Sequence, residues 1–147
     1  MVIWSDKSVA RTRCRARLRR AETRESGTAQ PCPTNFAADV KTIWIIDPEQ
    51  WPRAMLRAEL IERGFDAVGY LSISDAVAQL GVRFPDVIVI ELRGATRDDV
   101  AQLFQIAVPV IGIAGLPEPE WLGDFKWAAL PRRPVSIGEI ADRIAVQ

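Results

Sequence analysis

Acidic side chains close two apolar stretches of the sequence. The run "DVIVIEL" (86–92) carries Glu91 near its end, and "KTIWIID" (41–47) ends on Asp47. Runs of this length and composition are typical of strands that are buried on both faces of a parallel sheet. A carboxylate at the mouth of such a strand usually serves chemistry or a binding partner. Asp47 and Glu91 are therefore the first candidates for a functional site.

The 147 residues include no histidine. This excludes the most common general base, histidine-based catalytic triads, histidine zinc sites and phosphohistidine chemistry. Cys14 and Cys32 lack the spacing of a metal site, and we interpret them as free thiols in a reducing cytoplasm. The longest apolar stretch is too short to cross a bilayer, so we expect no membrane partner. No pattern indicates an enzyme.

Charge divides the chain into two parts. Residues 1–40 hold 8 Lys/Arg and 4 Asp/Glu, a net charge of +4, whereas residues 41–147 hold 11 and 15, a net charge of −4. The Arg-rich part has no apolar face in either a helix or a strand, and a polar stretch rich in turn-forming residues follows it. We expect 1–40 to be a disordered basic extension and linker, and 41–147 to be one folded domain.

From residue 41 the sequence alternates between strand-like and helix-like segments. The expected strands are 41–47, 66–71, 86–92, 108–114 and a brief 128–130; the expected helices are 52–63, 74–82, 96–106, 119–127 and 136–146. Ser74, Thr96 and Ser136 are the expected N-caps. This order predicts an α/β, flavodoxin-like, doubly wound (βα)5 fold with a five-stranded parallel sheet in the order 2-1-3-4-5.

Ligands of doubly wound sheets bind beyond the carboxyl ends of the strands. Asp47, Glu91 and Ala114 each lie at the end of an expected strand, so we expect them at the mouth of one crevice.

The order of elements and the strand ends resemble the receiver domain of two-component response regulators, over residues 41–145. The segments that carry the resemblance are "IWIIDPE", "FPDVIVIEL", "VPVIGIAG" and "LPRRP". They are similar to the first, third, fourth and fifth strands of that family, which end respectively in an acidic pair, the phosphorylated aspartate, a Thr or Ser, and a Lys-Pro pair. The resemblance implies phosphorelay signalling with a histidine kinase or a downstream effector as partner.

The functional positions of the family are mostly changed in this sequence. The resemblance places Asp47 and Pro48 at the acidic pair, Glu91 at the phosphoacceptor, Ala114 at the Thr or Ser, and Arg133 at the lysine. Of these five positions only Asp47 is unchanged. Because phosphoryl transfer depends on precise positioning and on charge neutralisation, we expect a degenerate phosphorylation pocket.

Magnesium binding is the weaker expectation. Glu49 could replace the carboxylate lost at Pro48, which makes Asp47, Glu49 and Glu91 weak candidates for metal ligands. Mg²⁺ requires near-octahedral oxygen geometry, and a missing or lengthened carboxylate spoils it. We therefore expect no cofactor and a phosphorylation-independent protein–protein signalling module; a conventional Mg²⁺-dependent phosphoacceptor is the alternative.

Two further questions stay open from the sequence. Glu91 and Arg133 either form an ion pair that holds one signalling state, or are ordinary polar residues of a solvated site. Trp121 and Trp127 either dock a partner, which includes a second copy of the chain, or pack over the edge of the core. Nucleic-acid binding by the Arg-rich extension is a third function, but the extension lacks interleaved aromatic residues, which makes this partner unlikely.

Overall fold

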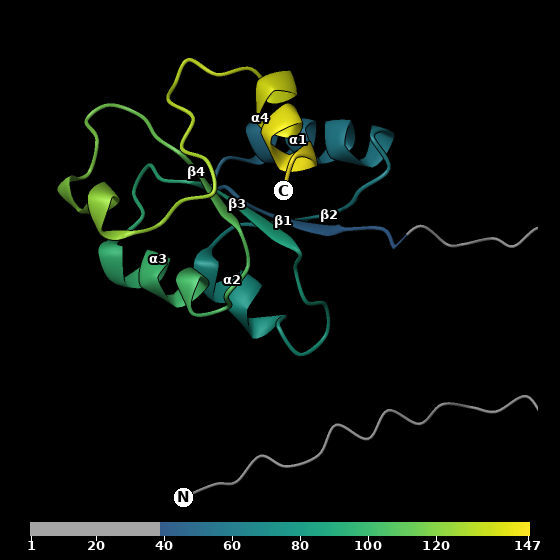
Figure 1. Cartoon of the computed structure of the whole chain (residues 1–147), viewed down its shortest axis with the longest axis horizontal. Coiled ribbons are helices and arrows are strands. Elements are labelled where there is room, and N and C mark those ends of the chain that lie inside the picture. Colours follow the sequence, from purple (N-terminus) through teal and green to yellow (C-terminus); the bar gives the residue numbers. More distant parts are fainter. Residues whose placement is uncertain (1–38) are drawn as a thin grey trace, which may run out of the picture. The chain divides into compact units, whose positions relative to one another are not determined.

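A parallel β-sheet lies between two layers of helices in the computed structural model, which describes residues 39–147 (Figure 1). The elements are β1 (Thr42–Ile46), α1 (Gln50–Glu62), β2 (Asp66–Tyr70), α2 (Ile73–Ala78), β3 (Val87–Glu91), α3 (Arg97–Phe104), β4 (Val110–Ile113), the 3₁₀ turn η1 (Glu120–Asp124) and α4 (Ile137–Ala145). The extension expected at 1–40 lies outside the described residues, apart from its last two. None of the helices described is long and apolar enough to span a membrane.

The strands follow the order β2-β1-β3-β4, and all neighbours are parallel. This confirms the expected order for four strands. The fifth position is held by residues 128–132, which run beside β4 through the isolated bridges Ile111↔Ala129 and Ala114↔Arg132. Pro131 has no N–H to donate, which limits a regular ladder in this segment.

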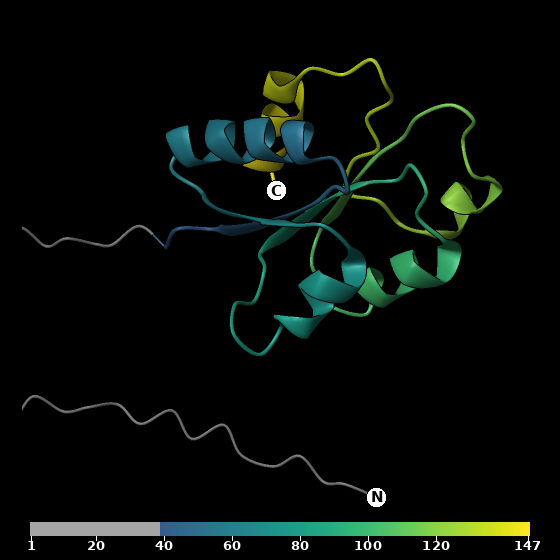
Figure 2. The same cartoon turned by 180° about the vertical axis from the view of Figure 1, so that it is seen from behind.

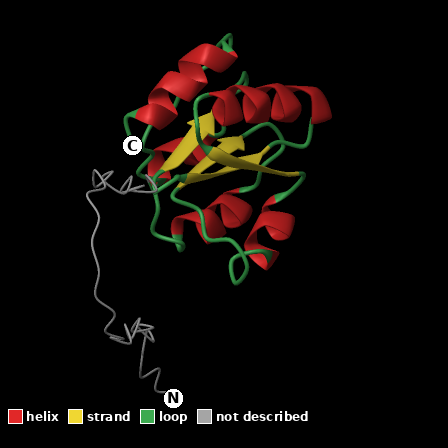
Figure 3. Ribbon diagram, turned by 90° about the vertical axis from the view of Figure 1, so that its right-hand side faces the viewer, coloured by secondary structure: helices red, strands yellow, loops and turns green. Residues whose placement is uncertain are grey.

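Two helices cover each face of the sheet: α1 and α4 lie on one side, and α2 and α3 on the other (Figures 2 and 3). The side chains of successive strand residues point to opposite faces of the sheet, so each strand contributes side chains to two apolar clusters. Ile43 and Ile45 join the cluster under α1 and α4, and Trp44 and Ile46 join the cluster over α2 and α3. All five residues of β3 are buried, including its last residue, Glu91.

The helix boundaries follow local sequence signals, with one error in the expectation. The α4 capping box between Ser136 and Glu139 is confirmed, as is the Thr96 cap of α3. The expected cap of α2 at Ser74 is wrong. Ser72 has the extended backbone of an N-cap, and its Oγ accepts a hydrogen bond from the Asp75 N–H at 3.1 Å. Ser74 instead lies inside the first turn of the helix.

The segment expected to form a helix at 119–127 forms only the short 3₁₀ turn η1. Gly123 lies within this turn, and glycine is a poor helix former. On the face of the sheet that α2 and α3 cover, the segment after β4 therefore contributes a loop with aromatic side chains in place of a further helix.

Candidate functional site

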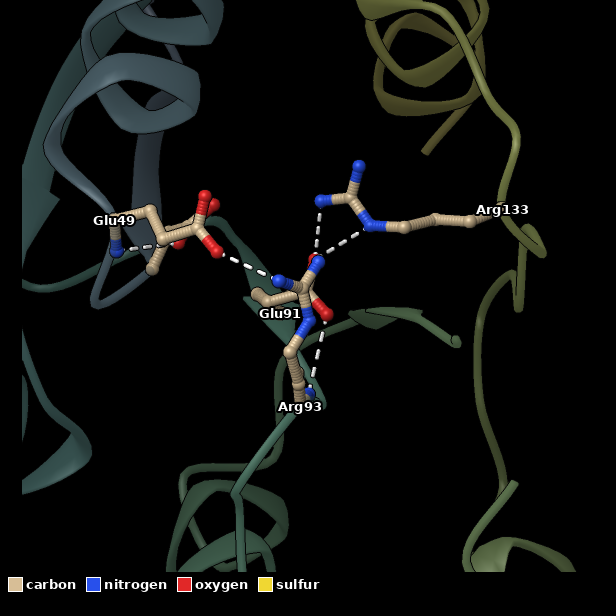
Figure 4. Close-up of polar contacts among 5 residues, drawn as sticks. Glu49, Glu91, Arg93 and Arg133 are labelled. Carbon is tan, nitrogen blue, oxygen red and sulfur yellow. Dashed lines mark hydrogen bonds and ion pairs between the residues drawn. The ribbon is translucent and has the colours of Figure 1, made fainter. Parts of the chain in front are cut away.

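Three charged side chains of the predicted pocket, those of Asp47, Glu91 and Arg133, lie near one another at the carboxyl end of the sheet. Figure 4 shows Glu91 and Arg133 pointing toward each other. Glu91 is the last residue of β3, and Asp47 follows β1 directly. Arg133 follows the edge segment beside β4, where its N–H donates to the Ala114 carbonyl at 2.8 Å. Because the strands are parallel, their carboxyl ends lie at the same edge of the sheet.

Glu91 and Arg133 form an ion pair. Arg133 Nε donates to Glu91 Oε2 at 3.0 Å, and Arg133 Nη2 donates to the same oxygen. The Glu91 side chain is only 3% exposed, whereas that of Arg133 is 33% exposed. The pair is therefore a buried carboxylate held by a guanidinium that still reaches solvent, not two residues of a solvated site.

Arg93 completes the contacts of Glu91 and was missed in the sequence. Its backbone N–H donates to Glu91 Oε1 at 3.1 Å, and its Nη1 donates to Glu49 Oε1 at 2.7 Å (Figure 4). The only available signal was the spacing in "ELRG", which puts an arginine two residues beyond the acid and before Gly94. Gly94 has φ 77°, a left-handed turn conformation that glycine adopts readily.

Asp47 is a buried carboxyl that forms no ion pair with a Lys or Arg side chain among residues 39–147. Its Oδ1 accepts a hydrogen bond from the Glu49 N–H at 2.8 Å. Burial raises the pKa of Asp47, and the negative charges of Glu91 and Glu49 raise it further, while the Glu49 N–H and Arg133 act in the opposite direction. Loss of hydration destabilises the ionised form of a buried acid.

The three candidate metal ligands do not come together as a ligand set. No group of three potential ligands suited to a metal ion occurs among residues 39–147. Glu91 is engaged by Arg133 and Arg93, and Glu49 turns outward to Arg93. Both oxygens of Glu91, one of Glu49 and one of Asp47 are thus bonded to guanidinium or amide N–H groups, so this arrangement does not fit the ion.

Pro48 and Ala114 complete the pocket without polar side chains. Ala114 is fully buried and has no hydroxyl that could respond to a phosphate. Pro48 lines a hollow of about 190 Å³ beside the pair, together with Ser72, Glu91 and Arg93. The residues at these two positions shape the crevice but offer no side-chain ligand to it.

Trp121 and Trp127 are both half-buried and pack against the cluster over α2 and α3. Trp127 makes an edge contact with Phe104, with ring centroids 5.1 Å apart, and its Nε1 donates to the Leu122 carbonyl at 2.9 Å. Trp121 contacts Phe125 edge-on. Their contacts match packing over the edge of the core, and a docking role for them stays a prediction.

No protein-family model matches the sequence, and no curated protein matches it. Solved structures do match. A CheY-like response regulator receiver domain from Methylobacillus flagellatus is 16% identical, with a TM-score of 0.58 over 73% of this chain and 98% of that one. A response regulator receiver protein from Sinorhizobium medicae is 19% identical, with a TM-score of 0.63 over 74% and 94%.

The signal receiver domain of a modulated diguanylate cyclase from Desulfovibrio desulfuricans is also 19% identical, with a TM-score of 0.63 over 74% of this chain and 93% of that one. The described residues therefore have the flavodoxin-like fold of response regulator receiver domains. At these identities the likeness defines the fold, and the function has to be argued from the site.

Proposed function

We propose that this protein is an atypical receiver that signals through protein–protein contacts and is not phosphorylated. The observation that carries the proposal is the Glu91–Arg133 pair. Its carboxylate belongs to the residue that the sequence resemblance assigns to the phosphoacceptor of receiver domains. The likeness to receiver domains supports a place in two-component signalling in the cytoplasm, with a histidine kinase or an effector as the protein partner.

The chemistry of the pocket supports this proposal. A phosphoryl acceptor needs a carboxylate oxygen that is free to attack, and both oxygens of Glu91 accept hydrogen bonds. Phosphoryl transfer also needs cations that neutralise the developing charge. Here Arg133 already neutralises Glu91, and Arg93 bonds Glu49. A Mg²⁺ ion would have to displace these guanidiniums.

The pair also supports a constant signalling state. Glu91 carries a single negative charge, whereas a phosphoryl group carries about −1.5 to −2 and three acceptor oxygens. Glu91 therefore imitates a phosphorylated acceptor only in part, but its pairing with Arg133 needs no kinase. A partner would recognise the surface that this pair holds, independently of phosphate.

Phosphorylation can be tested directly on the full chain. The protein is incubated with acetyl phosphate and Mg²⁺, beside a phosphorylatable receiver domain as the positive control, and the intact masses are compared. We expect the control to gain one phosphoryl group and this protein to gain none. A gain of one phosphoryl group on this protein would overturn the proposal in favour of the conventional Mg²⁺-dependent phosphoacceptor.

The Glu91→Asp variant separates the acceptor from its surroundings. It restores the residue type that the family phosphorylates but keeps Pro48, Ala114 and Arg133. We expect this variant to remain unmodified, because the other groups needed for transfer are still absent. If it alone is phosphorylated, the substitution at residue 91 is the whole cause, and the rest of the pocket is competent.

A further inference from the structure

β2 is the edge strand of the sheet, and on its outer side no strand of the described residues pairs with it. The Asp66 N–H donates to the Lys41 carbonyl at 3.0 Å, and the Asp47 N–H donates to the Tyr70 carbonyl at 3.1 Å. Residues 66, 68 and 70 therefore face β1. Since alternate residues of a strand point their backbone groups to opposite sides, Ala67 and Gly69 face outward.

These outward groups have few partners among the described residues. The Ala67 carbonyl accepts a hydrogen bond from Arg57 Nε at 3.0 Å. The N–H and carbonyl of Gly69 make no hydrogen bond with any residue in the described part of the chain. An exposed strand edge of this kind can pair with an added strand.

The α1 side of this edge is basic. A hollow of about 350 Å³ is lined there by Arg53, Arg57, Val68 and Gly69, among others. Arg53 donates to the Asp47 carbonyl at 2.5 Å, and Arg57 donates to Ala67. Both guanidiniums are thus bonded to neutral carbonyls, and neither forms an ion pair with a carboxylate among residues 39–147.

The α2 side of the same edge is largely apolar. A hollow of about 390 Å³ is lined by Val68, Tyr70, Ala78 and Val82, with polar residues of α2 and the following turn around them. Val82 is 82% exposed. The nearby Arg83 is paired with Asp66, so it adds no unpaired charge to this hollow.

We propose that the outer edge of β2 binds an extended acidic segment of a partner protein as an added strand. Side chains of an added strand point alternately to the two faces of the sheet. Acidic side chains would reach Arg53 and Arg57 on the α1 side, and the apolar side chains between them would enter the hollow beside Val82. Backbone hydrogen bonds to Gly69 give affinity, and the two unlike hollows select the alternating pattern.

Charge complementarity selects this occupant over the chain's own N-terminal part. Residues 1–40 carry a net charge of +4, and Arg53 and Arg57, which form no ion pair among residues 39–147, repel a segment of the same sign. The inference goes beyond the proposed function of the crevice. It stands whether or not Glu91 accepts a phosphoryl group, and the two tests fail independently.

The probe is an acetylated, amidated octapeptide of alternating Glu and Val, added to the full chain labelled with ¹⁵N. We expect saturable binding by isothermal titration calorimetry, with the Gly69 and Ala67 amide signals shifted in NMR spectra. Two controls have the same length: one with four Glu followed by four Val, and one of alternating Lys and Val. Both should bind at least about 10-fold more weakly, since the first loses the alternation and the second reverses the charge.

Matched variants separate the backbone contacts from the charge. Gly69→Pro removes the outward N–H, whereas Gly69→Ala keeps it and meets only the flexible side chain of Arg53, at 3.0 Å. We expect the Pro variant to bind roughly 2- to 10-fold more weakly than the Ala variant. Arg57→Gln should weaken binding by a similar factor. Arg63→Gln should not, because Arg63 pairs with Glu59 and Asp142 and does not line the hollow.

Three outcomes would overturn this proposal. The first is no saturable binding of the alternating Glu–Val peptide, and the second is equal binding of either control peptide. The third is a Gly69 amide signal that shifts with protein concentration when no peptide is present, because a second copy of the chain would then occupy the edge. Should Gly69→Pro fail to fold, Arg57→Gln and Arg63→Gln still decide the matter.

Discussion

Both hydrogen bonds from the Arg133 guanidinium to Glu91 end on one oxygen, Oε2, which leaves Oε1 to the backbone N–H of Arg93. The carboxylate therefore has three donors from two segments of the chain. One is the turn after β3, and the other is the end of the segment beside β4. A buried polar group is tolerated in an apolar environment when it is hydrogen-bonded and paired. This relationship explains how an apolar strand can end on a glutamate.

The two partners should respond unequally to mutation. Arg133→Gln leaves the buried Glu91 carboxylate without its guanidinium partner. We therefore expect a loss of roughly 2–4 kcal/mol in the free energy of unfolding. Glu91→Gln leaves Arg133, which is a third exposed and can be hydrated, so we expect a loss of about 1 kcal/mol. Chemical denaturation of both variants and the double variant measures these losses and the coupling between the residues.

Arg132 is the matched control for Arg133. It lies one residue earlier, is 63% exposed and pairs with Glu118 on the surface. Arg132→Gln should cost less than about 1 kcal/mol, as exposed ion pairs do. Equal losses in the Arg132 and Arg133 variants would mean that the buried pair contributes no more than a surface pair.

The ionised carboxyl of Asp47 should lower the free energy of unfolding at neutral pH. Burial raises its pKa in the folded state, so the ionised carboxyl destabilises the folded protein wherever the pH lies above that value. Asp47→Asn removes the charge and keeps an oxygen for the Glu49 N–H. We expect a higher free energy of unfolding at pH 7, with a gain that shrinks in acid as the wild-type carboxyl takes up a proton.

Thermal melts from pH 7 down to pH 4 measure this dependence. Asp39→Asn is the control, since Asp39 is exposed and makes no side-chain hydrogen bond with another described residue. Its melting temperature should follow the wild type at each pH. A variant Asp47→Asn that is less stable than the wild type at pH 7 would show that the ionised carboxyl is stabilising.

The sequence was most informative for strands that are buried on both faces of the sheet. Long apolar runs such as 41–47 and 86–92 predicted the central strands correctly, because a strand covered on both faces must be apolar throughout. The edge segment at 128–132 was less predictable. Its three apolar residues fit a strand, but proline and its position at the sheet edge leave only isolated bridges.

The sequence predicted the residues of the candidate site that lie at strand ends, but it did not predict the one that lies in a loop. The parallel topology brings Asp47, Glu91 and Arg133 together, so their positions followed from the element order. Arg93 could not be predicted in the same way. Its contact with Glu49 depends on the path of two loops, and its backbone contact with Glu91 depends on the tight turn before Gly94.

The position of the α2 cap can be tested with two neighbouring serines. Ser72→Ala removes the acceptor for the Asp75 N–H, and we expect a loss of about 1 kcal/mol. A helix of six residues depends strongly on such a cap. Ser74→Ala is the control and should change stability by less than about 0.5 kcal/mol, because Ser74 lies inside the first turn of α2 and not at its N-cap. Urea denaturation compares the two, and a larger loss at Ser74 would contradict the observed cap.

Gly112 allows Trp127 to lie against β4. A Cβ added at Gly112 would stand 2.7 Å from Trp127 Cζ3 and 2.9 Å from Leu92 Cδ1, which is closer than carbon atoms pack. Gly112→Ala should therefore cost about 1–3 kcal/mol through overpacking. Gly115→Ala is the matched control three residues later, where an added Cβ meets nothing within 4 Å. Denaturation followed by circular dichroism measures both. Equal stability of the two variants would show that Trp127 moves away from β4 at little cost, and would make its side chain available to a partner.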